Sequence, residues 1–183
     1  QYTYIESAKE KGYEVLLLDS PIIPHLMQKL ESKKEKIKFS RVDSDTLENL
    51  IKKDEEVISK LTDEEKEKLK PMIETAVENE KYTVQLEALD SNSMPFMLAQ
   101  PEFMRRMKEM QQTGGGAMGN LPEMYSLIVN TNHELVGKIL NTRTEKKRNS
   151  LIKQSIDLAK LSQNNLTGKD LTEFINRSID LIK

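Results

Sequence analysis

The spacing of hydrophobic and polar positions changes several times along the chain, and each change predicts an element. Residues 4–11 are spaced as in a helix that ends at Gly12, where a glycine commonly follows the last helical turn. Residues 15–18 form an uninterrupted apolar run, which is typical of a strand covered on both faces. Two prolines then open a helix that reaches Leu30. This small α/β segment is too short to form a domain alone, so we expect it to be the tail of a larger one.

The next part of the chain is highly charged. Residues 37–42 alternate between apolar and polar positions as a short strand does, and residues 43–80 are typical of charged helix. Residues 62–65 form a capping box, Thr-Asp-Glu-Glu, that starts one of these helices. Pro71 lies within that helix, where it predicts a kink or a break.

Three further segments predict a sheet. Residues 82–88 alternate as a half-buried strand, residues 90–93 are typical of a turn, and residues 94–98 form the expected partner strand. Residues 124–129 supply a third strand. The simplest arrangement is a three-stranded, mainly antiparallel sheet with helices packed against it, so the predicted fold class is α+β.

The chain ends in three predicted helices. Residues 131–134 form a second capping box, which starts the first of these helices. The second and third helices carry more apolar surface than one copy of the chain is expected to cover. A second copy would supply the missing cover in a four-helix bundle with two-fold symmetry; the alternative is that the sheet covers these helices completely. The expected dimer contacts are Leu151, Ile152, Ile156, Leu158, Leu161, Leu171, Phe174, Ile175, Ile179 and Ile182.

Methionines gather in one part of the chain. Seven of the nine lie between residues 94 and 124, in a stretch that also contains three consecutive glycines at 114–116. Residues 101–110 predict a short amphipathic helix whose apolar side consists of Phe103, Met104, Met107 and Met110. Methionine adapts to apolar partners of different shape, so this helix is a candidate surface for binding varied apolar segments. The alternative is that the methionines pack into the core of their own chain.

Composition narrows the possible chemistry. The 183-residue chain has no cysteine, which excludes disulfides and thiolate chemistry and fits a reducing cytoplasm. No apolar run is long enough to cross a membrane, and the basic run 146–148 is too short to predict nucleic-acid binding. His25 and His133 lack metal-ligand spacing, and no phosphate-binding loop or nucleophile motif is present, so we expect no enzyme. Because the first residue is Gln1, we expect a fragment of a longer protein.

The order of these features resembles the heat shock protein 90 chaperone family in its bacterial form. Residues 12–18 and the helix after them resemble the end of the family's middle domain. The strand pair with Ser93-Met94-Pro95, the Met-rich segment, residues 125–134 and the two last helices resemble its C-terminal dimerisation domain. The resemblance predicts a middle-domain end at residues 1–42 and a dimerisation domain at 43–183, with the amphipathic helix and glycine loop at 101–120.

The resemblance implies a cytoplasmic, ATP-driven chaperone that works as a homodimer on unfolded or partly folded client proteins. The family's ATP- and magnesium-binding domain precedes everything seen here, so this fragment should hold no cofactor and should not hydrolyse ATP. The Met-rich helix should project between the protomers, and His25 and Gln28 should add client contacts from the preceding domain. The chain lacks the family's acidic Met-Glu-Glu-Val-Asp tail, so tetratricopeptide co-chaperones are not expected.

Two interpretations from other classes remain open. One is a Met-rich module that binds signal sequences, although the alternating strand at 82–88 and the net charge of -2 count against it. The other is a purely structural dimerisation domain whose methionines face inward.

Overall fold

A computed structural model describes residues 2–20, 22–34, 36–51, 57–77, 81–101, 103–107, 124–163 and 165–182. Met110 and the glycine loop lie outside the described residues. Contacts within the chain define two compact units, one from residues 1–52 and 100–123 and the other from residues 53–99 and 124–183. The predicted domain boundary after residue 42 stays a prediction.

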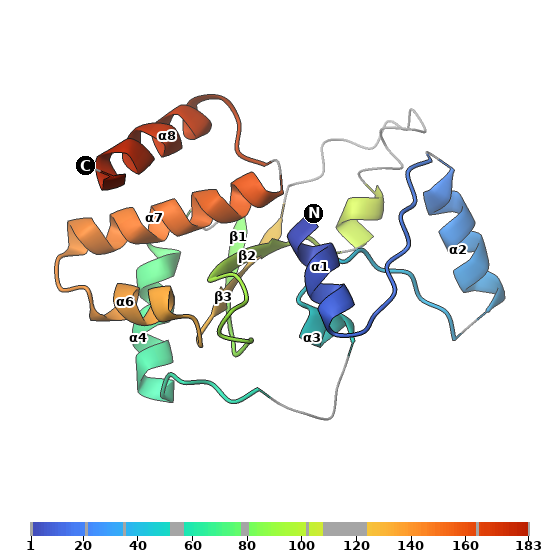
Figure 1. The fold of residues 1–183 in the computed structure, drawn as a ribbon, viewed down its shortest axis with the longest axis horizontal. Coiled ribbons are helices and arrows are strands. Elements are labelled where there is room, and N and C mark those ends of the chain that lie inside the picture. Colours follow the sequence, from blue (N-terminus) through green and yellow to red (C-terminus); the bar gives the residue numbers. More distant parts are fainter. Residues whose placement is uncertain are drawn as a thin grey trace. The chain divides into compact units, whose positions relative to one another are not determined.

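The second unit is built on a mixed three-stranded sheet (Figure 1). Its strands are β1 (Tyr82–Glu87), β2 (Phe96–Ala99) and β3 (Tyr125–Asn130), in the order β1-β3-β2. β3 runs parallel to β1 and antiparallel to β2. The α+β class is therefore confirmed, but the sheet is mixed rather than mainly antiparallel, and the predicted pairing of residues 82–88 with 94–98 is wrong. The reason is that β3, buried from Leu127 to Asn130, lies between the other two strands and pairs with both of them.

Three helices share an apolar core with this sheet. They are α4 (Asp63–Glu74), α6 (Glu134–Asn141) and α7 (Glu145–Ser162), and α7 packs against β2 while α4 packs against β1. The core consists of aliphatic side chains and one phenylalanine from all of these elements: Leu69, Ile73, Val84, Phe96, Leu98, Leu127, Val129, Val136, Ile139, Ile152, Ile156 and Ala159. A smaller cluster of Leu89, Ala99 and Ile128 lies apart from this core. The last helix, α8 (Gly168–Ile182), packs against α7 (Figure 1).

The starts of two helices test the predicted capping boxes. The Thr62 hydroxyl accepts from the Glu65 amide, and the Glu65 carboxylate accepts from the Thr62 amide, so the first capping box is confirmed. The second is wrong, because His133 caps α6 by accepting the Leu135 amide proton at Nδ1 over 3.0 Å. The Thr131 hydroxyl instead donates to the Glu87 carbonyl.

Helical segments in the charged stretch are shorter than expected. Within residues 43–80 the described helices are α3 (Leu47–Leu50) and α4, and α4 passes through Pro71 without a break before it ends at Glu74.

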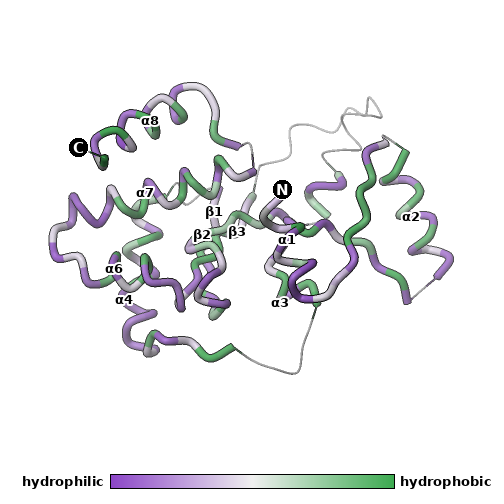
Figure 2. Tube along the Cα trace, in the orientation of Figure 1, coloured by the Kyte–Doolittle hydropathy of each residue, from purple (hydrophilic) through white to green (hydrophobic). Residues whose placement is uncertain are grey.

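The first unit contains α1 (Tyr2–Glu10), α2 (Ile23–Lys33) and α3, together with a short helix at residues 103–107. α1 is followed by Gly12 at φ +81°, which confirms the predicted helix end. Residues 15–18 have no regular secondary structure and do not form the predicted buried strand, because no described strand lies beside them. Their leucines are exposed by 71%, 80% and 47% in chain order, and Figure 2 shows the hydrophobic run in the segment before α2. Residues 37–42 are not a strand either.

Candidate functional site

The short helix at residues 103–107 carries three of the four side chains predicted to bind apolar partners. The Pro101 carbonyl accepts from the Arg105 amide over 3.1 Å at its start. Phe103 is 70% exposed, whereas Met104 and Met107 are half-buried. Met110, the fourth residue, lies outside the described residues. The helix therefore presents one aromatic ring that is mostly exposed and two methionines that are partly exposed.

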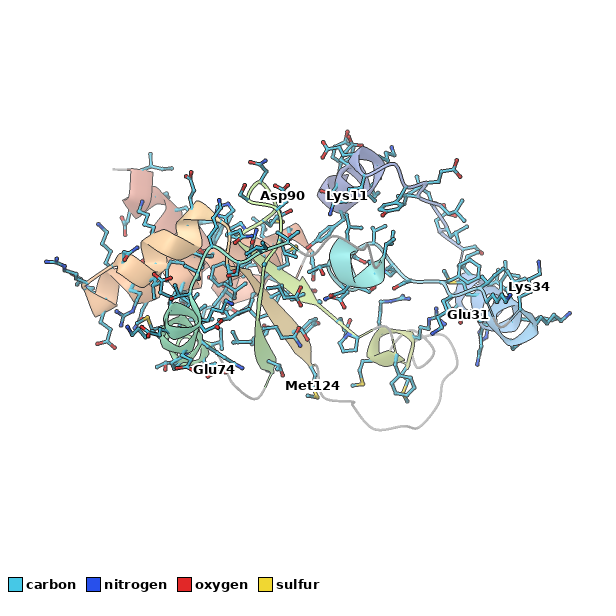
Figure 3. The ribbon with its side chains drawn as sticks, turned by 90° about the horizontal axis from the view of Figure 1, so that it is seen from below. Lys11, Glu31, Lys34, Glu74, Asp90 and Met124 are labelled. Atoms are coloured by element: carbon cyan, nitrogen blue, oxygen red, sulfur yellow. The ribbon has the colours of Figure 1, made fainter. Side chains whose placement is uncertain are left out.

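A network around Arg106 fixes this helix to α2 and to the segment that follows it. Arg106 donates from Nη1 to Glu31 Oε2 over 2.7 Å and from Nη2 to Glu31 Oε1 over 3.2 Å. Nη2 also donates to the Phe39 carbonyl over 2.7 Å, and the Phe39 amide donates to Glu31 Oε1 over 2.7 Å. Figure 3 labels Glu31 on α2. The sequence does not predict this network, because Arg106 and Glu31 are 75 residues apart and no local pattern relates them.

The network also sets the electrostatics of Glu31. The hydrogen bonds from Arg106 and from the Phe39 amide lower the pKa of the Glu31 carboxyl, with a smaller contribution from Lys38. The shift means that the carboxylate is stabilised more in the folded chain than in the unfolded one. This stabilisation is fully present above the ordinary glutamate pKa, and it is lost as the pH falls through the lowered folded value.

We expect the pKa of Glu31 to rise in an Arg106→Gln variant, because the amide removes the charge and the paired hydrogen bonds. The carboxyl carbon of Glu31 should show this rise in an NMR titration. The matched control is Lys38→Gln, which should raise the pKa much less, since Lys38 acts only through charge at a distance. Equal titration curves for wild type and Arg106→Gln would show that the network does not form in solution.

An open cavity of about 720 Å³ lies beside this network in the first unit. Arg105 and Arg106 line it, while Phe103, Met104 and Met107 do not. Its lining from the start of α2 consists of Ile23, Pro24 and Met27. His25 and Gln28 are exposed on α2 and do not line the cavity. The structure therefore does not gather all the predicted client contacts around one cavity.

The second candidate surface lies on α7 and α8. Ile152 and Ile156 are in the core of their own chain, and Phe174 is also buried. Leu151 and Leu171 are half-buried. The remaining predicted contacts are exposed: Leu158 by 43%, Leu161 by 40%, Ile175 by 48%, Ile179 by 47% and Ile182 by 86%. Among the described side chains of these two helices, five large apolar ones are thus exposed in a single copy.

Neither unit suggests a metal centre or a membrane span. Among the described residues, no three His, Asp or Glu side chains gather as metal ligands would. No helix in the described part of the chain has the length and apolar character to cross a bilayer.

Comparison with known proteins identifies relatives that share most of this sequence. No family model matches the chain. Chaperone protein HtpG of Porphyromonas gingivalis is 39% identical over 166 residues, which cover 88% of this chain and 24% of the relative. The HtpG proteins of Bacteroides thetaiotaomicron and Bacteroides fragilis are 32% and 31% identical over the whole chain and 37% of each relative. The chain thus spans about a quarter to somewhat over a third of these relatives' length.

These matches, together with the α+β fold, first define the class: the chain belongs to a family of molecular chaperones. That family is heat shock protein 90 in its bacterial form, HtpG. The resemblance seen in the sequence is confirmed, and the relatives favour a chaperone over a signal-sequence-binding module.

Proposed function

We propose that this chain provides homodimerisation and part of the client-binding surface of a bacterial heat shock protein 90 chaperone. The observation that carries the proposal is the uncovered apolar surface of α7 and α8, at Leu158, Leu161, Ile175, Ile179 and Ile182. Exposed apolar patches on one copy mark interaction sites, and a second copy supplies a matching surface in a symmetric dimer.

Client binding is the second part of the proposal. Phe103 is an exposed aromatic anchor, and Met104 and Met107 beside it can adapt to apolar segments of different shape. His25 and Gln28 are exposed and available for polar contacts. The relatives bear the name chaperone protein, which supports unfolded or partly folded proteins as the partners.

The ATPase part of the chaperone cycle belongs to other segments of a full-length parent in this proposal. This chain then holds neither ATP nor magnesium and acts in the cytoplasm without nucleic acid or tetratricopeptide partners. Isothermal titration of the chain with Mg-ATP tests this point, and measurable binding would contradict it.

We expect a Phe103→Ser, Met107→Gln variant to bind a fluorescent, permanently unfolded carboxymethylated protein about tenfold more weakly than wild type. Full burial of a large apolar side chain contributes about 1.5–3 kcal/mol, so partial contact through two side chains accounts for a loss of this size. Fluorescence anisotropy measures the binding, and the melting temperature should stay unchanged.

The control for this variant is Tyr2→Ser, which removes another exposed aromatic ring, 75% exposed, from the same unit. It should leave binding unaltered. A large drop in melting temperature without a binding defect in the Phe103→Ser, Met107→Gln variant would instead support the purely structural interpretation.

A further inference from the structure

Polar contacts hold α8 on α7. Gln154 donates to the Ser178 hydroxyl over 2.7 Å, and Lys153 donates to the Glu173 carboxylate over 3.1 Å. Arg177 donates to Asp157 on α7 and, over 3.4 Å, to the Gln154 side-chain oxygen. Phe174 is a buried apolar residue of α8. Hydrogen bonds and ion pairs thus connect α8 to α7 beside this buried side chain.

Asp157 is the deeply buried member of this set. Its side chain is 4% exposed, compared with 40% for Glu173. Two cations contact it, Arg177 from α8 and Lys160 from its own helix at 3.8 Å. Burial raises the pKa of Asp157, while Lys160 and Arg177 act in the opposite direction. A buried carboxylate is costly unless it is paired, so α7 alone leaves Asp157 poorly compensated and α8 supplies the second positive charge.

The position of Arg177 on α8 determines where the exposed isoleucines point. Ile175 and Ile179 lie two residues before and two residues after it. At about 100° per residue, each isoleucine is about 200° around the helix from Arg177. When Arg177 binds Asp157, the Ile175 and Ile179 side chains must therefore face away from this contact, in agreement with their exposure of 48% and 47%.

We propose that Asp157 and Arg177 are positioning residues for dimerisation. Their ion pair fixes the rotation of α8 on α7, so that Ile175 and Ile179 face a second copy of the chain. This inference rests on the proposed function, since it assumes that the uncovered surface of α7 and α8 is the dimer interface.

Sedimentation equilibrium of the 183-residue chain tests the inference, with hydrogen exchange of α8 as a second measurement. Arg177→Met leaves Asp157 with Lys160 as its one contacting cation, and Asp157→Asn leaves Arg177 with the more exposed Glu173 carboxylate of its own helix, 3.9 Å away. Each should raise the Kd of the dimer by about tenfold or more and speed amide exchange in α8, while exchange in β3 stays unchanged. The double variant Asp157→Asn, Arg177→Met carries neither charge of the pair. It should dimerise more tightly than Arg177→Met alone, because no buried carboxylate is left without its partner.

The matched control is Lys153→Met, which removes an ion pair to α8 whose two side chains are 53% and 40% exposed. Its Kd should stay within about twofold of wild type, because exposed ion pairs contribute little. If Arg177→Met does not fold, the Kd and the α8 exchange of Asp157→Asn, which keeps the shape of the side chain, test the positioning role.

The outcomes separate this inference from the function on which it rests. A wild-type chain that stays monomeric at every concentration overturns both. A wild-type dimer whose Kd and α8 exchange are unchanged in Asp157→Asn and Arg177→Met overturns the positioning role alone.

Discussion

An Ile175→Asp, Ile179→Asp variant is expected to be monomeric at micromolar concentrations at which the wild-type chain is a dimer. Both isoleucines are about half exposed in one copy, at 48% and 47%, so a dimer would bury them further. An unpaired carboxylate in such an interface costs several kcal/mol, and about 4 kcal/mol corresponds to about a thousandfold in Kd. Light scattering or sedimentation across a dilution series measures this loss.

The choice of residues matters for interpreting this variant. Phe174 is an equally obvious target from the sequence, but it is 9% exposed within its own chain, so a charge there would unfold the protomer. The control is Lys169→Glu with Asn176→Asp, which adds more negative charge at exposed polar positions of the same helix. That control should remain a dimer. Dimerisation of both variants alike would show that α8 does not form the interface.

Elements governed by local periodicity could be predicted from the sequence. The stripes of α7 and α8 repeat every three or four residues, and this spacing alone places Ile152 and Ile156 on one face. The capping box at Thr62 likewise depends on residues three positions apart. These predictions hold because each rests on a few neighbouring residues.

Features that depend on distant parts of the chain could not be predicted in this way. The central place of β3 follows from pairing with both β1 and β2, which periodicity within one strand does not specify. Thr131 and His133 were both available to cap α6, and the carbonyl of Glu87, 44 residues away, engages the threonine. The candidate site shows the same limit, since the apolar side of the Met-rich helix is visible in the sequence but its attachment through Arg106 and Glu31 is not.

An apolar run has an ambiguity of another kind. Residues 15–18 have the composition of a buried strand, yet burial requires neighbouring strands that supply hydrogen bonds and cover. The described residues contain no such strand beside them, and the leucines are exposed. Composition thus indicates that a segment favours burial, but only the structure shows whether neighbouring strands bury it.

The largest loss of stability is expected from Asn130→Ala at the end of β3. Asn130 is fully buried, and its Oδ1 accepts from the amides of Leu89 over 3.2 Å and Asn132 over 3.0 Å. Its Nδ2 donates over 2.8 Å to the carbonyl of Asp90, which is labelled in Figure 3. Alanine would leave two buried N–H groups and one carbonyl without these partners.

Each unsatisfied buried group costs about 1–3 kcal/mol, so the free energy of unfolding should fall by about 3–5 kcal/mol in urea denaturation. Asn130→Leu separates the causes: it fills most of the space but satisfies none of the three groups, and it should be nearly as destabilising as alanine. Asn141→Ala on α6 is the control, because that side chain is exposed and donates to a carbonyl of its own helix. It should change stability by less than about 0.5 kcal/mol. Wild-type stability in Asn130→Leu would mean that the side chain of Asn130 stabilises the fold by packing and not by its hydrogen bonds to the turn after β1.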